Sequence, residues 1–310
     1  MFERVLVTGG GGLVGRSIKE VSSLYPQYDF LFSHRSQYDL TVEKEVRNLF
    51  EEFKPDYVIH TAAKTGGLKK NLKTPAEQYY HNILINTYVT HYSYLYKVKK
   101  LLAFSSVACF DPELEILTEE KLQYGQPHKS FQSYAYTKRM LDIQIDAYNK
   151  QYKTNFSSII CGNIFGKHDG FNTEHGHVVP SLIHKCYIAK KDNLPLKVWG
   201  DGTPWREFIY SKDLANICLK VLAINKPLPQ RIIASGDNPI TIRQLVNNIC
   251  NIFDHKQVQW GRNSFNGNPK RITNKKILMD LLPNFSFTNL NDSLNETISW
   301  FIHHYPKVRL

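Results

Sequence analysis

The chain has 310 residues and carries 39 Lys and Arg against 28 Asp and Glu, so its formal net charge is +11. Its 42% content of apolar residues is enough to bury a sizeable core, which excludes a disordered chain, a collagen-like repeat and a coiled coil. No apolar run approaches the roughly 18–20 residues of a membrane span, and the first residues lack the pattern of a signal peptide. We therefore expect a cytoplasmic protein with no membrane partner.

Cysteines and charges add two expectations. The five cysteines are widely spread and none belongs to a C-x-x-C pair, which predicts a reduced protein without disulfides or a metal site. A zinc site is the alternative, but no cysteine accompanies its candidate ligands His168, His175, His177 and His184. Basic pairs such as Lys69-Lys70 are scattered and are interpreted as solvated faces, so no nucleic-acid partner is expected.

Strand-like and helix-like patterns alternate through the first half of the chain. In chain order we expect strands at 4–8, 30–33, 57–60, 101–105 and 157–162, and helices at 13–24, 43–53, 75–97 and 133–152. This alternation predicts an α/β fold with a Rossmann-type, doubly wound parallel sheet. After about residue 166 the strands become short, and Gly, His, Asn and Pro become frequent. That change indicates a smaller C-terminal substrate domain at the carboxyl ends of the strands.

A glycine-rich turn follows the first expected strand. Gly9, Gly12 and Gly15 have the spacing G-x-x-G-x-x-G, which lets the backbone approach a pyrophosphate at the start of a helix. The end of the second strand, residues 33–36, has no carboxylate for a ribose 2′-hydroxyl but contains Arg35. We therefore expect NADP rather than NAD, although Arg35 could also be an ordinary surface residue.

A tyrosine and a lysine form a Y-x-x-x-K pair in the last expected helix. At this spacing Tyr134 and Lys138 lie on one helix face, where an ammonium group favours ionisation of the phenol. The fourth strand ends at Ser105-Ser106, whose hydroxyl can bind a reacting carbonyl. These residue types predict proton transfer to a ketone.

At this point the sequence resembles the extended short-chain dehydrogenase/reductases, and among them the GDP-L-fucose synthase family. The resemblance covers nearly the whole chain. It includes the glycine turn, the Tyr134/Lys138 pair and the segments AAKTGG (62–67), GNIFGKHD (162–169), GHVVP (176–180) and VWGDGTPWREF (198–208). It implies a Rossmann domain over residues 1–166, rejoined by about 207–237, and a nucleotide-sugar domain over 167–206 and 238–310.

The resemblance also implies roles for individual residues. Tyr134 would protonate the 4-oxygen of a GDP-linked 4-keto sugar, Ser106 would hydrogen-bond that oxygen, and Lys138 would tune Tyr134. NADPH would be bound by the turn, the second strand and neighbouring loops, through Gly9, Gly12, Leu13, Val14, Gly15, Arg35, Ala62, Ala63, Lys138 and Asn163. The sugar nucleotide would contact Lys185, Trp199, Arg206 and Asn266, with Arg206 on the diphosphate.

The sequence departs from the family at a proton-transfer residue. The family uses a Cys two residues after the catalytic Ser, together with a His, to epimerise C3 and C5 before C4 is reduced. Here that position is Ala108, which cannot transfer a proton, and Cys109 is displaced by one residue. His177 matches the family's His. Cys161 is a further departure, for which a buried, inert thiol is expected.

We therefore expect a C4-ketoreductase without efficient epimerase activity, similar to reductases of GDP-heptoses and related capsule sugars. The alternatives are the complete epimerase-reductase, with Cys109 or another acid in place of the missing Cys, and a non-catalytic NADP sensor. The intact set of Ser106, Tyr134 and Lys138 argues against the sensor.

A tyrosine-rich helix predicts a homodimer. Six tyrosines lie in the segment expected to be helical over 75–97, namely Tyr79, Tyr80, Tyr88, Tyr92, Tyr94 and Tyr96. Some must pack on the sheet, and the excess suggests a helix-pair interface of the kind that the family forms. Core packing alone is the alternative.

Overall fold

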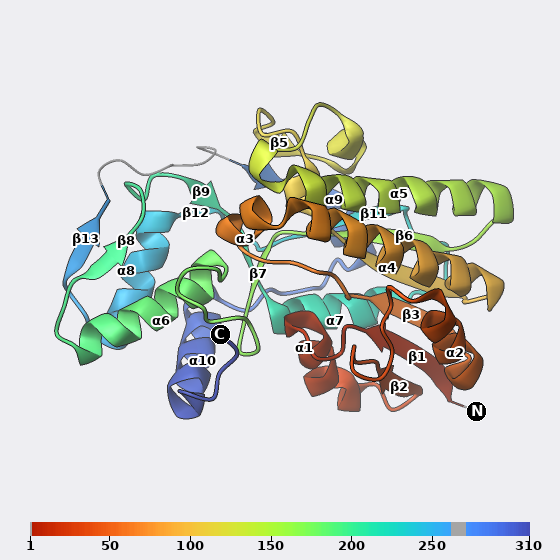
Figure 1. Cartoon of the computed structure of the whole chain (residues 1–310), viewed down its shortest axis with the longest axis horizontal. Coiled ribbons are helices and arrows are strands. Elements are labelled where there is room, and N and C mark those ends of the chain that lie inside the picture. The colour runs from red at the N-terminus through yellow and green to blue at the C-terminus, as the bar shows by residue number, and fades with distance from the viewer. Residues whose placement is uncertain (1, 262–270) are drawn as a thin grey trace.

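The computed structural model describes residues 2–261 and 271–310, and its centre is a parallel sheet. Six strands pair in the order β11-β6-β4-β3-β1-β2 (Figure 1). Their bounds are β1 Glu3–Thr8, β2 Tyr28–Phe32, β3 Tyr57–His60, β4 Lys100–Ser106, β6 Phe156–Cys161 and β11 Arg231–Ala234. All neighbouring pairs are parallel. The predicted Rossmann-type fold is therefore confirmed.

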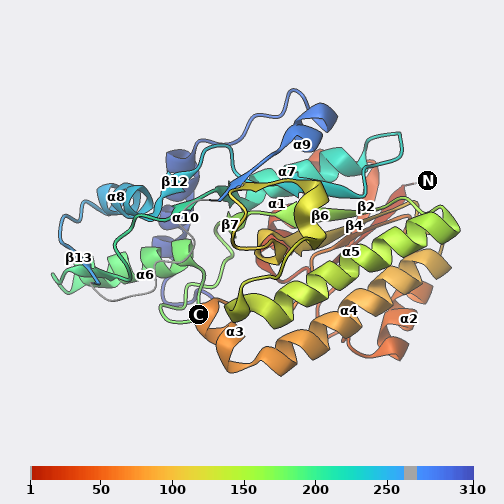
Figure 2. The ribbon, with the colours of Figure 1, turned by 90° about the horizontal axis from the view of Figure 1, so that it is seen from above.

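Helices cover both faces of this sheet, so its strands are buried on both sides. Val5 and Val7 of β1 face one core, which also contains buried residues of α1 (Leu13–Val21) and α7 (Ser211–Leu222). Leu6, between them, faces the opposite core. There the covering helices are α2 Glu43–Phe53, α4 Pro75–Leu95 and α5 Gln132–Tyr152, with α4 and α5 side by side (Figure 2). The two-residue period of a strand sets this division.

The remaining elements form a smaller lobe with a core of its own. Its buried cluster joins residues of α6 Val178–Lys191, α8 Ile242–Phe253 and α10 Leu290–His304. Its short strands are β8 Leu196–Val198, β9 Trp205–Arg206, β12 Ile240–Thr241 and β13 Val258–Trp260. The lobe lies beside the main sheet in both views (Figures 1 and 2).

Shorter elements connect these layers. Strand β7 Asn163–Phe165 pairs with β10 Phe208–Tyr210, and β5 Ile116–Leu117 pairs with β14 Ile272–Thr273. The remaining helices are α3 Leu68–Lys73 and α9 Lys276–Leu281, with short 3-10 turns at η1 Ser22–Leu24, η2 Val107–Cys109, η3 Glu119–Gln123 and η4 Lys129–Phe131.

Helix α3 is a difference from the sequence-based expectation, since no helix is expected between residues 60 and 75. Its six residues form one turn and a half whose N-cap, Gly67, is fixed by a hydrogen bond from its N–H to the carbonyl of His175, 3.0 Å away. A contact 108 residues away in sequence thus holds it in place, and local periodicity cannot reveal such a contact.

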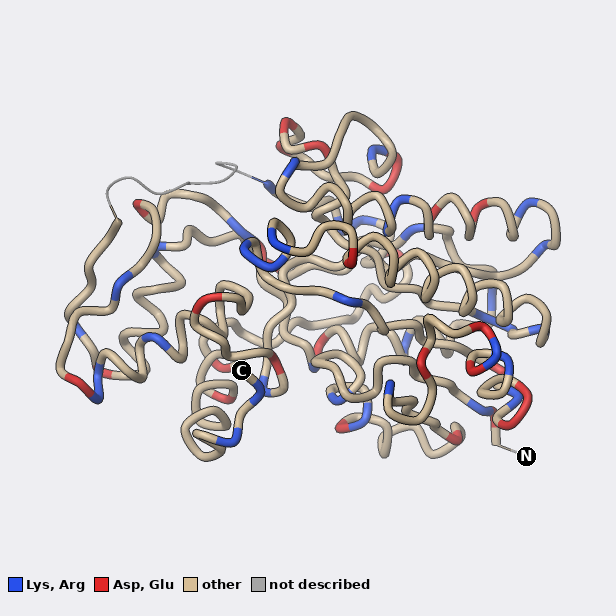
Figure 3. Tube along the Cα trace, viewed as in Figure 1, with Lys and Arg blue, Asp and Glu red and all other residues tan. Residues whose placement is uncertain are grey.

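Charged residues are distributed over the whole trace, with Asp and Glu among the Lys and Arg (Figure 3). None of the helices within residues 2–261 and 271–310 is both long and apolar enough to cross a membrane. The five cysteines are all buried and unpaired by disulfides.

A buried ion pair connects the last strand of the sheet to α5. The Arg231 guanidinium donates to both carboxylate oxygens of Asp142, with its Nη2 2.7 Å from Oδ2 and its Nε 2.8 Å from Oδ1. The Asp142 side chain is 0% exposed, and its negative charge raises the pKa of Arg231. Because the two partners lie 89 residues apart, the pair fixes β11 against a helix from the first half of the chain.

Removing the cation alone should destabilise the fold strongly. Arg231→Leu leaves a buried carboxylate without its counter-charge, so we expect the free energy of unfolding to fall by about 3–5 kcal/mol. Urea denaturation monitored by circular dichroism measures this loss. The double variant Asp142→Leu/Arg231→Leu, in which no charge remains buried, should lose less than the single variant, and an equal or greater loss would contradict the explanation.

Candidate active site

The glycine turn between β1 and α1 brings its backbone segments into very close contact. Gly9 has φ +72°, which favours glycine, and a Cβ on Gly15 would lie 2.4 Å from the carbonyl oxygen of Gly9. Gly12 is the N-cap of α1, and no side chain of the described residues caps it. The side chains of Leu13 and Val14 are buried. The backbone N–H groups of this first helical turn have no partner within the helix and can bind a ligand. These features fit the phosphates of a dinucleotide.

The segment after β3 is held against this turn by side-chain hydrogen bonds. The Thr61 hydroxyl donates to the carbonyl of Thr8, with the two oxygens 2.7 Å apart, and the N–H of Ala62 donates to the Thr8 hydroxyl. Asn82 of α4 hydrogen-bonds both the N–H and the carbonyl of Lys64. The stretch that contains Ala62 and Ala63 is therefore fixed beside the phosphate turn.

Arg35 lies at the end of β2, on the same side of the turn. The carbonyl of Ser33, two residues before Arg35, accepts from the N–H of Gly10 at 2.9 Å. The Arg35 side chain is 70% exposed and forms an ion pair with Asp39, at 3.0 Å. Its guanidinium can meet a 2′-phosphate only by sharing or leaving this carboxylate.

Ser106, Tyr134 and Lys138 meet where β4 ends and α5 begins. The side chains of Ser106 and Tyr134 hydrogen-bond each other, and the Lys138 ammonium lies 6.0 Å from the centroid of the Tyr134 ring. Burial lowers the pKa of Lys138 to about 8 and raises the pKa of Tyr134, against the opposing effect of the Ser106 hydrogen bond. Burial, rather than the ammonium expected from the sequence, thus dominates the Tyr134 pKa, which keeps the phenol protonated as an acid.

Residues 107–109 form the 3-10 turn η2 immediately after Ser106. The backbone N–H of Ala108 donates to the Ser106 hydroxyl at 3.1 Å, so Ala108 lies directly beside it. Cys109 is 0% exposed and packs with Phe110, Leu117 and Leu122. Burial raises the pKa of the Cys109 thiol, and its sulfur lies 3.5 Å from the carbonyl oxygen of Ala135. The thiol is therefore fully buried, 3.8 Å from the Ser105 hydroxyl and within electrostatic range of Lys138.

His177 is the N-cap of α6 and is paired with a buried carboxylate. Its Nδ1 lies 3.3 Å from Oδ1 of Asp169, whose side chain is only 2% exposed. The negative charge of Asp169 raises the pKa of His177, despite the opposing effects of burial and of Arg309. A histidine held in this way can take up and return a proton near neutral pH.

Lys185 and Trp199 meet in the smaller lobe, and Lys69 of α3 joins them. The ammonium of Lys185 lies 4.4 Å from the Trp199 ring centroid, and that of Lys69 lies 5.1 Å from it. Trp199 is 54% exposed, so the ring is accessible to a ligand. Sequence analysis assigned Lys69 to a solvated face. Only the docking of α3 onto the smaller lobe shows its place here.

A second arginine, Arg271, lies within electrostatic range of Arg206 and was not selected by sequence analysis. Burial and the positive charge of Arg206 lower the pKa of Arg271 to about 10. Nη2 of Arg271 lies 3.3 Å from the carbonyl oxygens of both Val107 and Phe110, so this side chain also holds the turn after Ser106. Within the described residues, its buried Nε has no hydrogen-bond partner. Two guanidinium groups that repel each other favour a bound anion nearby.

Three other residues singled out in the sequence have different outcomes. The Asn163 side-chain amide donates to the carbonyl of Glu207 at 2.9 Å, which fixes the crossing between the sheet and the smaller lobe. Asn266 lies outside the described residues. Cys161 is buried opposite Ser106 in the pairing of β4 with β6, and burial raises the pKa of its thiol.

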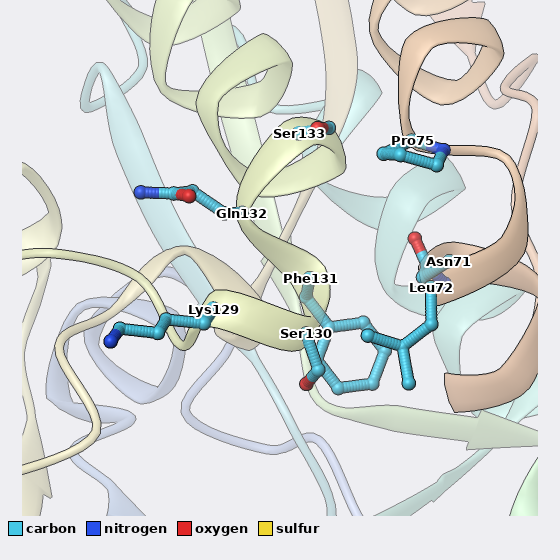
Figure 4. A pocket seen from close by; sticks show the side chains of 8 residues that line it. All are labelled: Asn71, Leu72, Pro75, Lys129, Ser130, Phe131, Gln132 and Ser133. Carbon is cyan, nitrogen blue, oxygen red and sulfur yellow. The ribbon is translucent and has the colours of Figure 1, made fainter.

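A small pocket of about 140 Å³ lies at the start of α5, immediately before Tyr134. Its walls come from α3, the start of α4 and the η4 segment (Figure 4). The lining residues are Asn71, Leu72, Pro75, Lys129, Ser130, Phe131, Gln132 and Ser133. Among the described residues, no group of three or more His, Cys, Asp and Glu side chains could hold a metal ion.

Comparisons with known proteins agree with this geometry. Residues 5–234 match the model of the NAD dependent epimerase/dehydratase family. A GDP-L-fucose synthase from Dictyostelium discoideum is 36% identical over 310 residues, which cover 98% of this chain and 97% of the relative. A GDP-L-fucose synthetase from Naegleria fowleri bound to NADP has a TM-score of 0.92 at 31% identity, covering 99% of this chain and 96% of that one.

More distant structures share the fold. A GDP-6-OMe-4-keto-L-xylo-heptose reductase from C. jejuni has a TM-score of 0.87 at 22% identity, with 98% of each chain covered.

The glycine turn gives a direct prediction. In Gly15→Ala the added Cβ meets the Gly9 carbonyl at 2.4 Å, so the turn must open and the affinity for NADPH should fall by at least about tenfold. Fluorescence titration with NADPH measures the change. Gly170→Ala is the control, because its added Cβ meets nothing closer than 3.7 Å. An unchanged affinity in Gly15→Ala would refute the assignment of the turn.

The His177 pair predicts a pH effect. Because Asp169 raises the folded-state pKa of His177, the pair stabilises the fold below the unfolded pKa of His177, and this contribution is lost as the pH rises through the folded pKa. Asp169→Asn should therefore lower the pKa of His177, as measured by NMR titration of the imidazole. Glu174→Gln, which removes the partner of Lys69 instead, should leave it unchanged. A His177 pKa that does not fall in Asp169→Asn would exclude this pairing.

Proposed function

Because the chain belongs to the NAD-dependent epimerase/dehydratase family, we propose that it is an NADPH-dependent C4-ketoreductase of a GDP-linked 4-keto-6-deoxy sugar. We further propose that it lacks efficient C3/C5 epimerase activity. The similarity to GDP-L-fucose synthases and to an NADP-bound relative supports the substrate class and the cofactor. The predicted family membership is confirmed, while the residue roles below belong to the proposal.

In this proposal, reduction uses the residues at the ends of β4 and α5. NADPH supplies the hydride that C4 receives. Ser106 donates a hydrogen bond to the 4-oxygen, and Tyr134 transfers its proton to that oxygen as negative charge develops there. The burial that keeps the phenol protonated supports its role as the acid, and the buried Lys138 ammonium favours the phenolate that remains.

The basic residues of the smaller lobe suit the nucleotide part of the substrate. Arg206 and Arg271 form a pair of cations for the diphosphate, which relieves their mutual repulsion. Lys185 and Trp199 extend this surface, and Lys69 brings a further positive charge to it. We also propose that Asn266 contacts the sugar nucleotide, which rests on the sequence alone.

The missing epimerase activity is supported by the turn after Ser106. Epimerisation at a carbon next to a ketone needs a proton donor and a proton acceptor on opposite faces. Ala108 lies beside the Ser106 hydroxyl, where a donor would have to be, and offers only a methyl group. Cys109 cannot replace it without leaving the apolar cluster in which it is fully buried. This arrangement of Ala108 and Cys109 carries the proposal.

The complete epimerase-reductase is the second candidate. It is favoured by the identity of 36% to a GDP-L-fucose synthase and by the His177–Asp169 pair, which retains one of the two proton-transfer groups. A non-catalytic NADP sensor is disfavoured, since Ser106, Tyr134 and Lys138 lie together. The proposed substrate is a hexose or a heptose. The proposal also includes a role in the synthesis of capsule sugars.

We also propose that two parts of the chain bind different ligands, as expected from the sequence. Residues 1–166 and about 207–237 would bind the cofactor, and residues 167–206 and 238–310 the sugar nucleotide. The pairing of β11 with β6 and the packing of α7 on α1 support the return of the chain to the first part. The buried, unpaired cysteines support a cytoplasmic location.

A homodimer through α4 and α5 completes the proposal. Tyr88, Tyr92, Tyr94 and Tyr96 pack against the core, whereas Tyr79 and Tyr80 are exposed. Met140 and Ile143 of α5 are also exposed, so the two adjacent helices present an apolar surface.

Size-exclusion chromatography with light scattering tests the dimer. We expect the wild type to be dimeric and Ile143→Glu to be monomeric at micromolar concentration, because a charge would be buried at the interface. Leu24→Glu is the control, since it places the same charge on an exposed leucine of η1. A monomeric wild type would refute the interface.

An incubation in deuterated water tests the reaction. With NADPH and GDP-4-keto-6-deoxymannose, NMR of the wild-type product should show reduction at C4 and no deuterium at C3 or C5 beyond a blank without enzyme. Tyr134→Phe should reduce the rate by about 10²–10⁴-fold, because the acid is lost.

Restoring a thiol beside Ser106 tests the explanation. Ala108→Cys should introduce deuterium at C3 or C5, whereas the neighbouring control Val107→Cys should not. Deuterium at these carbons in the wild-type product would instead establish the epimerase-reductase. If the hexose ketone is not reduced, the same assay with the corresponding heptose ketone decides between a heptose reductase and no reductase.

A further inference from the structure

A chain of buried hydrogen bonds crosses the sheet beneath the site. The N–H of Ala62 donates to the hydroxyl of Thr8 over 3.4 Å, and that hydroxyl lies 2.7 Å from Nδ1 of His60. Nε2 of His60 lies 3.3 Å from Oδ1 of Asn86, whose amide nitrogen lies 3.2 Å from the carbonyl oxygen of Thr137. Thr8, His60 and Thr137 are 0% exposed, and Asn86 is 1% exposed. The chain therefore runs from the phosphate turn to the helix that carries the catalytic pair.

The groups at the two ends of this series of hydrogen bonds fix the direction of every bond in it. Thr137 contributes a carbonyl, so Asn86 must donate with its amide and accept with Oδ1. His60 therefore carries its proton on Nε2 and accepts from the Thr8 hydroxyl at Nδ1. Thr8 in turn accepts from the N–H of Ala62. A neutral imidazole satisfies all four contacts, and burial together with the charge of Lys138 lowers the pKa of His60 to about 3.

We propose that His60 is a positioning residue that aligns the cofactor turn with Tyr134 and Lys138. This inference rests on the proposed function of the site but adds a residue to which that proposal gives no role. Thr8 is the last residue of β1, directly before Gly9, and Thr137 directly precedes Lys138. His60 ends β3, the strand next to β1 in the sheet. It thus joins the two elements whose relative position sets the distance between cofactor and acid.

The contacts of His60 distinguish this role from simple core packing. An apolar side chain of similar size would fill the space but leave the Thr8 hydroxyl and the Asn86 carbonyl without partners in a buried site. A glutamine can replace both contacts, because its carbonyl accepts and its amide donates over a similar separation. Replacement by leucine and by glutamine therefore separates the effect of the hydrogen bonds from that of volume.

Kinetics and cofactor affinity of these variants test the inference. In His60→Leu we expect kcat to fall by about 10–100-fold and the Kd for NADP to rise by about tenfold, because the site is no longer pre-aligned. His60→Gln should restore both values to within about threefold of the wild type. Asn86→Leu should reproduce the kcat loss. Thr90→Val is the matched control on α4, because Thr90 is equally buried and its hydroxyl has no partner among the described residues.

The outcomes are distinguishable from those of the proposed reaction. The NADP titration needs no sugar, so a wild type that binds NADP but reduces no GDP-4-keto sugar would refute the reaction and leave the affinity comparison to decide the role of His60. The inference is overturned if His60→Leu unfolds cooperatively yet keeps kcat and Kd within about threefold of the wild type. It is also overturned if folded His60→Gln is as impaired as His60→Leu, since volume alone would then explain the loss.

Discussion

The register of four parallel strands is the constraint on which the site depends. Thr8 pairs with His60 across β1 and β3, His60 with Ala103 across β3 and β4, and Ser106 with Cys161 across β4 and β6. The polar residues that end β1, β3 and β4 therefore lie at one edge of the sheet. Because the strands are buried on both faces, a slip of one residue would turn apolar side chains out of both cores and move this whole set. The stability of the sheet and the alignment of the chemistry thus share one origin.

The turn after Ser106 places two neighbouring side chains in different surroundings. The 3-10 geometry of η2 leaves residue 108 beside the hydroxyl and sends residue 109 into the core. In an extended segment, by comparison, successive side chains alternate between faces. In the structure the backbone is a 3-10 turn, yet residues 108 and 109 still have different surroundings, because Cys109 packs in the apolar cluster around Phe110. The Cys109 thiol therefore packs within this cluster.

Local patterns were enough to predict the framework of the molecule. The helix expected over 43–53 and the strand expected over 57–60 have the bounds of α2 and β3, since the first has helical spacing of its apolar residues and the second is a short continuous run of buried residues. The glycine turn and the Tyr134/Lys138 spacing are equally local. Contacts between segments far apart in the sequence could not be predicted from these local patterns. Lys69 depends on the docking of α3, and Arg271 on the approach of two loops, so neither has a sequence signature of its own.

Electrostatics were the least predictable part of the site. The spacing of Tyr134 and Lys138 predicts their proximity, but the balance between burial and charge that sets their pKa values depends on the whole surrounding core. The same holds for His60, which reads as the last residue of an ordinary buried strand. Its role in the hydrogen-bond chain requires α4 and α5 to be in place, and neither lies near it in sequence.

Arg271 holds the turn after Ser106 entirely through backbone carbonyls, those of Val107, Phe110 and Asp111. The side chains at 107 and 108 contribute nothing to this anchor. Evolution can therefore exchange them while the path of the backbone persists. The side chain beside the Ser106 hydroxyl can therefore change without loss of the contacts that hold the turn.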